Sequence, residues 1–114
     1  MSKTHHTIDY IELPVDATGA AKAFYAAAFG WTFQDYGPTY AALSAGIDGG
    51  FQADPAEKTP APLAIVYSAD LDASLAAVRL AGGEITRGVF DFPGGRRFHF
   101  RDPSGNELAV WSDR

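Results

Sequence analysis

Apolar and polar residues alternate in short runs along most of this chain, a pattern typical of β-strands. The first run covers residues 7–13 and stops at Pro14. Residues 17–29 instead place alanines and aromatic side chains at helical spacing, so we expect a helix with Thr18 as its N-cap and Gly30 at its C-terminal end. Three further short strands are expected at residues 31–34, 40–44 and 47–52.

The second half of the chain repeats this order of elements. Residues 54–62 contain three prolines and few apolar side chains, which indicates a linker or an exposed loop. After a β-rich run at residues 63–67, Asp70 or Asp72 is expected to cap a helix over residues 73–80. The remaining strands are expected at residues 84–92, 96–101 and 107–112. The pattern predicts one α+β domain, residues 1–114, with two βαβββ modules at about 7–53 and 63–112.

Composition restricts the possible partners. The chain has 114 residues, 46% of them apolar, and a net charge of −5, which argues against nucleic acid or an anionic membrane as a partner. It has no cysteine, which excludes disulfides and thiolate sites and is compatible with the cytoplasmic location that we expect. We find no apolar run near the roughly 20 residues of a membrane span, and the first residues lack the apolar segment expected of a signal peptide. We assign no metal site to the pair His5-His6.

The C-terminal hairpin is the most informative segment. Two alternating runs flank an Asp-Pro-Ser-Gly-Asn turn at residues 102–106. With the segments at 23–31 and 70–83, this turn resembles the vicinal-oxygen-chelate superfamily, which includes glyoxalase I, bleomycin-resistance proteins and extradiol dioxygenases. Residues 10–15 and 92–98 are most similar to the bacterial group of enzymes related to lactoylglutathione lyase. The resemblance covers nearly the whole chain and implies that the two modules form a curved mixed sheet with a concave cleft.

The resemblance also says where a metal would bind. Metal-dependent members of the superfamily use four side chains on the concave face, and each must donate a lone pair. Three of these positions correspond here to Tyr10, to Leu63 or Ala64, and to Ala109. At the fourth, only Gln52 offers a donor. Leucine and alanine cannot ligate, and protonated tyrosine rarely does. We therefore expect no bound metal and no cofactor.

Period-two alternation divides the side chains between the two faces of the sheet. Aliphatic and phenylalanine side chains of the strands are expected to pack on the helices, which leaves polar and aromatic residues, among them Arg97 and Arg101, on the other face. We predict that the ligand contacts on that face are Tyr10, Glu12, Gln52, His99, Glu107 and Trp111. His99 is the candidate acid or base, because the reference pKa of histidine is about 6.5.

Structural interpretations of the same residues remain open. The two carboxylates can pair with arginines, Glu12 with Arg97 and Glu107 with Arg101. His99 stands between two phenylalanines in the sequence, which is also typical of a half-buried histidine with satisfied hydrogen bonds. Tyr10 and Trp111 can instead be core or interface aromatics.

Three functional hypotheses are compatible with these residues. The first is metal-independent binding of a small molecule in an aromatic cleft, as bleomycin-resistance proteins do. The second is a lyase or isomerase related to lactoylglutathione lyase, with a divalent metal or His99 as base. An accessory or structural dimer is the third. The expected partners are a small-molecule ligand and a second copy of the chain, because family members pair modules and bare edge strands would invite aggregation.

Overall fold

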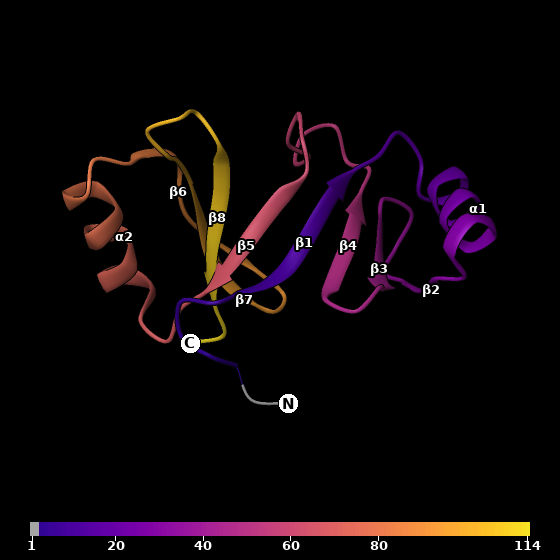
Figure 1. Ribbon diagram of the computed structural model, residues 1–114, viewed down its shortest axis with the longest axis horizontal. Helices are drawn as coiled ribbons and strands as arrows, with labels where there is room; N and C mark the ends of the chain where they lie inside the picture. Colours follow the sequence, from indigo (N-terminus) through magenta and orange to yellow (C-terminus); the bar gives the residue numbers. More distant parts are fainter. Residues whose placement is uncertain (1–2) are drawn as a thin grey trace. The chain divides into compact units, whose positions relative to one another are not determined.

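The computed structural model describes residues 3–114, which contain eight strands and two helices in the predicted order (Figure 1). The prediction of an α+β fold built from two βαβββ modules is confirmed. The described residues form two compact units, an N-terminal unit of residues 10–63 and a C-terminal unit of residues 3–9 and 64–114. No helix in residues 3–114 is long and apolar enough to cross a membrane.

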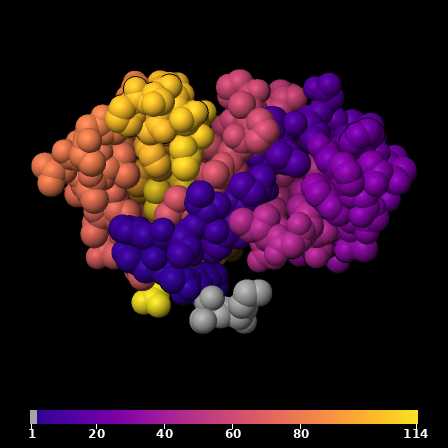
Figure 2. Space-filling view, viewed as in Figure 1, coloured from indigo at the N-terminus to yellow at the C-terminus, as the bar shows by residue number. Residues whose placement is uncertain are grey.

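The first module consists of β1 (Ile8–Pro14), α1 (Thr18–Phe29), β2 (Thr32–Asp35), β3 (Tyr40–Ser44) and β4 (Asp48–Gln52). Its strands lie in the order β2-β3-β4-β1, and β1 runs parallel to β4 while the other neighbours are antiparallel. Helix α1 packs on β2 and β4. It has no fully buried residue, and its outer side forms part of the surface in Figure 2.

A small aromatic core holds α1 on its strands. Phe51 is fully buried, and the Tyr25 ring on α1 lies 5.4 Å from it and stacks on Trp31 at 4.8 Å. Gly30 ends the helix with φ of 70°, as expected. The expected Thr18 cap is wrong. The helix begins at Thr18 itself, Ala17 occupies the cap position with no side-chain hydrogen bond, and the Thr18 hydroxyl donates to the Pro38 carbonyl at 3.5 Å.

The second module consists of β5 (Leu63–Tyr67), α2 (Leu71–Leu80), β6 (Glu84–Phe92), β7 (Gly95–Arg101) and β8 (Glu107–Ser112). Its strands lie in the order β5-β8-β7-β6, with β5 parallel to β8. Helix α2 packs on β6, β7 and β8, where Leu71, Phe98 and Val110 form the buried core. Of the two predicted caps, Asp70 is the one used, since its carboxylate accepts from the Ala73 N–H at 3.1 Å.

Candidate functional site

The face of β7 and β8 that points away from α2 carries the polar residues predicted for it. The antiparallel register aligns Arg97 with Trp111, His99 with Ala109, and Arg101 with Glu107. Phe98 and Val110, one residue along each strand, belong to the core under α2. The predicted division of these two strands into an α2-facing side and a polar side is therefore confirmed.

His99 and Glu107 form a hydrogen-bonded pair on this face. The His99 Nδ1 atom lies 3.1 Å from a Glu107 carboxylate oxygen, and the Thr86 hydroxyl donates to the same oxygen at 3.3 Å. The suggested pairing of Glu107 with Arg101 is wrong, because Arg101 instead binds Glu84 at 2.9 Å. Glu107 is thus the partner of the histidine.

The second ring nitrogen of His99 is the unusual atom of this site. His99 is only 2% exposed, and its Nε2 atom is buried with no hydrogen-bond partner among the described residues. Among the described residues, His99 therefore has a hydrogen-bond partner at Nδ1 and none at Nε2. Buried polar atoms without partners are uncommon, since each costs about 1–3 kcal/mol of desolvation.

The surroundings of His99 favour its neutral form. Burial lowers the pKa of His99 below its usual value, and the positive charge of Arg97 lowers it further. The hydrogen bond to Glu107 raises the pKa of His99 but does not outweigh these two effects, and Arg87 adds a smaller lowering. The imidazole is therefore neutral at pH 7.

Aromatic rings of β6 extend the site, and our sequence reasoning did not include them. The Phe90 ring lies 5.8 Å from the His99 ring and carries the Arg87 guanidinium 3.6 Å above its centre. Phe92 lies 6.2 Å from the Trp111 ring. Two register shifts between β6 and β7 interrupt the alternation of side chains between the two faces of β6. A strict period of two therefore assigns Arg87 to the wrong face. The sequence feature that indicates this aromatic surface is the pair Phe90 and Phe92, directly before the turn between β6 and β7.

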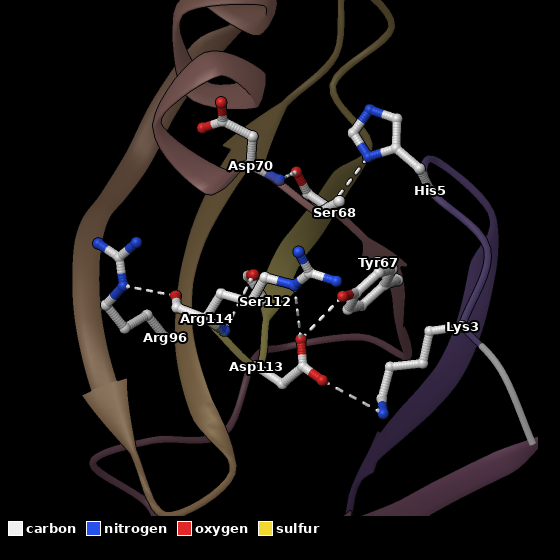
Figure 3. Close-up of polar contacts among 10 residues, drawn as sticks. Lys3, His5, Tyr67, Ser68, Asp70, Arg96, Ser112, Asp113 and Arg114 are labelled. Carbon is white, nitrogen blue, oxygen red and sulfur yellow. Dashed lines mark hydrogen bonds and ion pairs between the residues drawn. The ribbon is translucent and has the colours of Figure 1, made fainter.

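Trp111 is held in one orientation by the start of the chain. Its indole N–H donates to the Asp9 carboxylate at 2.9 Å, and the Lys3 ammonium lies 5.7 Å from the ring centre. Figure 3 shows Asp113 between Lys3 and the Tyr67 hydroxyl, which donates to the Asp113 carboxylate at 2.7 Å. The hydrogen bond to Tyr67 lowers the pKa of Asp113. These contacts attach residues 3–9 to the β5 and β8 strands.

The histidine pair near the start of the chain has a structural role of the same kind. His5 Nδ1 accepts from the Ala69 N–H at 2.9 Å, and His6 Nε2 lies 2.8 Å from the Ser74 hydroxyl. The backbone N–H of His6 donates to the Tyr67 carbonyl at 2.7 Å. The His5 imidazole therefore binds the segment before α2, and the His6 imidazole binds Ser74 within α2.

A second polar cluster lies in the N-terminal unit. The Tyr40 hydroxyl donates to the Glu12 carboxylate at 3.2 Å and makes a short hydrogen bond with the Tyr10 hydroxyl. Since the single Tyr40 proton goes to Glu12, Tyr10 donates to Tyr40. Glu12 is 4% exposed. Burial and the Glu12 charge raise the pKa of Tyr40, which keeps this hydroxyl protonated as a donor.

Tyr40 was not among the predicted site residues. The parallel pairing of β1 with β4 aligns Glu12 with Gly50, and β3 in turn aligns Ala42 with Gly50. Gly50 leaves its side-chain position open, and both tyrosine hydroxyls occupy that space. The side-chain oxygen of Gln52, another predicted site residue, accepts a hydrogen bond from the Asp54 N–H at 3.0 Å.

The residues at the family's metal positions do not fit a metal. Leu63 and Ala109 are fully buried and carry no donor atom. Within residues 3–114, no three His, Asp or Glu side chains are grouped in a way that could hold a metal ion. A shallow hollow beside the start of α1, lined by Val15, Ala17 and Phe24 among others, contains none of the predicted site residues.

Comparison with known proteins agrees with this architecture. Residues 7–110 match the family model of the glyoxalase/bleomycin resistance protein/dioxygenase superfamily. The chain belongs to this superfamily. No curated protein is similar enough in sequence to count as a match.

Solved structures share the superfamily fold at low sequence identity. A Mn(II)-bound glyoxalase from Novosphingobium aromaticivorans is 24% identical with a TM-score of 0.68, and the match covers 99% of this chain and 40% of that one. Methylmalonyl-CoA epimerase from Mycobacterium tuberculosis is 15% identical with a TM-score of 0.71, covering 98% and 92%. A protein from Bacillus halodurans is 10% identical with a TM-score of 0.80, covering 97% and 96%. At these identities the likeness establishes the fold alone.

Proposed function

We propose that this superfamily member binds a small planar molecule without a metal, and that the polar face of the C-terminal unit supplies the contacts. The observation that supports this most is the buried His99 Nε2 atom, which has no partner among the described residues, on a ring whose centre lies 5.8 Å from that of Phe90. Ligand sites typically combine apolar and aromatic walls with a few placed polar groups. Phe90, Phe92 and Trp111 provide the walls, and His99 provides the polar group.

The loss of donor atoms at two of the family's metal positions, Leu63 and Ala109, supports the metal-independent part of the proposal. Leu63 and Ala109 cannot hold a cation, so a metal would have to be held by residues other than those the family uses. Tyr10, Glu12 and Gln52 remain predicted ligand contacts. For Tyr10 and Glu12, the hydrogen bonds through Tyr40 fix the orientation of both side chains.

Phenol is a suitable first probe for this function. We expect roughly millimolar affinity, as is usual for a fragment of seven non-hydrogen atoms. NMR spectra of the protein should show that phenol shifts the Trp111 indole N–H and the His99 ring signals. Trp31, which stacks on Tyr25 in the other unit, is an internal control whose indole signal should stay unchanged.

Two results would refute the proposal. One is the absence of shifts on this face with phenol and with a panel of other planar fragments. The other is about one tightly held metal ion per chain after purification without chelator, accompanied by a rise in melting temperature when that metal is added.

The His99–Glu107 pair supports a second function, an isomerase or lyase in which His99 is the base. A neutral imidazole oriented by a carboxylate is a common general-base arrangement. Such a base would exchange a C–H proton beside a carbonyl with solvent. Deuterium incorporation into hydroxyacetone in D₂O, present with wild type and lost in His99→Gln, would favour this enzyme over the binding protein.

A further inference from the structure

The proton of the His99 imidazole has a defined position. An ionised carboxylate only accepts hydrogen bonds, so the 3.1 Å contact between Nδ1 and the Glu107 oxygen requires a proton on Nδ1. In the neutral ring the other nitrogen, Nε2, then carries a lone pair and no proton. Thr86 donates to the same Glu107 oxygen and helps to hold the carboxylate in place.

We propose that His99 rests as the Nδ1–H tautomer and that its Nε2 lone pair accepts a hydrogen bond from an O–H or N–H group of the bound molecule. This inference rests on the proposed binding function and names the chemistry of its ligand. The site selects planar molecules that carry a hydrogen-bond donor at the edge of the ring. A donor that reaches Nε2 satisfies a buried atom that otherwise has no partner.

The charges around His99 restrict the donor further. Arg97 on β7 and Arg87 on β6 both act on the imidazole as positive charges, and Glu107 on β8 acts as a negative charge that is already hydrogen-bonded to Nδ1. An ammonium group at Nε2 would be repelled by both arginines. A neutral hydroxyl or ring N–H, or the same group on an anionic molecule, is not repelled in this way. The structure therefore favours phenol-like or azole-like ligands over cationic ones.

The tautomer is tested directly by ¹⁵N NMR of the His99 ring, which distinguishes a protonated from an unprotonated nitrogen. We expect a protonated Nδ1 and an unprotonated Nε2 at pH 7. In Glu107→Ala the Nδ1–H loses its acceptor, so the population with a proton on Nε2 should rise. Glu84→Ala is the matched control, since Glu84 is an exposed carboxylate of the same unit that binds Arg101, and the tautomer should not change. A proton on Nε2, or a doubly protonated ring, in the wild type would overturn the inference.

The ligand contact is tested with phenol and anisole, which share a ring but differ in the O–H donor. We expect phenol to bind roughly 2- to 10-fold more tightly than anisole, the usual net effect of one hydrogen bond. In His99→Phe, which keeps an aromatic ring and removes the acceptor, this ratio should fall to about one. Equal binding of both probes on the wild-type face would overturn the inference and leave the proposed function intact. If neither probe binds, the inferred ligand contact is overturned, and if the panel of other planar fragments also fails, so is the proposed function. The tautomer is decided separately by the nitrogen spectra.

Discussion

The Gly50→Ala substitution tests the tyrosine–glutamate cluster of the N-terminal unit most directly. A Cβ atom at Gly50 would lie 2.5 Å from Tyr40 Cζ and 2.7 Å from the Tyr10 hydroxyl oxygen, and closer still to the Tyr40 hydroxyl. Ordinary van der Waals contacts begin near 3.4 Å. The two tyrosine side chains must therefore shift, and we expect this shift to disrupt the hydrogen bond from Tyr40 to Glu12.

Three free-energy changes contribute. Overpacking of a tight site destabilises by about 1–3 kcal/mol. Loss of the hydrogen bond from Tyr40 to the buried Glu12 carboxylate adds about 1–3 kcal/mol. The lower backbone entropy of alanine in the unfolded chain offsets about 0.4–1 kcal/mol. We expect a net loss of roughly 2–4 kcal/mol, which for a domain of this size lowers the melting temperature by roughly 8–16 °C.

Urea denaturation and calorimetry measure this change. Gly88→Ala is the matched control, because Gly88 also lies in a strand and a Cβ atom there meets nothing within 4 Å. We expect Gly88→Ala to stay within about 0.5 kcal/mol of the wild type. If Gly50→Ala is as stable as Gly88→Ala, the tyrosine hydroxyls do not occupy the space over Gly50 and the described cluster is wrong.

Four further predictions concern the caps, the site and the assembly. Asp70→Ala should lose about 1 kcal/mol of stability with its cap, whereas Asp72→Ala, a largely exposed carboxylate, should be near neutral, and equal losses would argue against the cap. Folding lowers the pKa of His99, so the unfolded chain binds more protons as pH falls through about 6.5 and stability falls with it. His99→Phe should lose less stability than wild type between about pH 7.5 and about pH 5.5 in urea titrations, and a loss as large as that of wild type contradicts the lowered pKa. Trp111→Ala should weaken phenol binding while circular dichroism still reports a folded chain, and unfolding would make Trp111 structural. Sedimentation should show a homodimer, and only monomer at tens of micromolar would contradict it.

The sequence by itself determined the features that depend on neighbouring residues. Alternation with a period of two identified the strands and assigned the faces of β7 and β8, because successive side chains of a strand point to opposite sides. The final hairpin was predicted in the same local way, from an Asp-Pro-Ser-Gly-Asn turn between two alternating runs. Local signals failed at Thr18, since a hydroxyl caps a helix only if the backbone leaves the helical conformation at that residue, and the helix here already includes it.

The tertiary structure decided everything that depends on strand register. Tyr40 joins Tyr10 and Glu12 because β4 lies between β3 and β1, an order that no local pattern encodes. His99 meets Glu107, which stands opposite Arg101 in the ladder, because side chains reach diagonally to the next pair on the same face. The neutral state of His99 also arises from burial and from Arg97, and both are properties of the packed unit. Sequence spacing identifies which residues share a face, whereas only the folded ladder sets which atoms come within hydrogen-bonding distance.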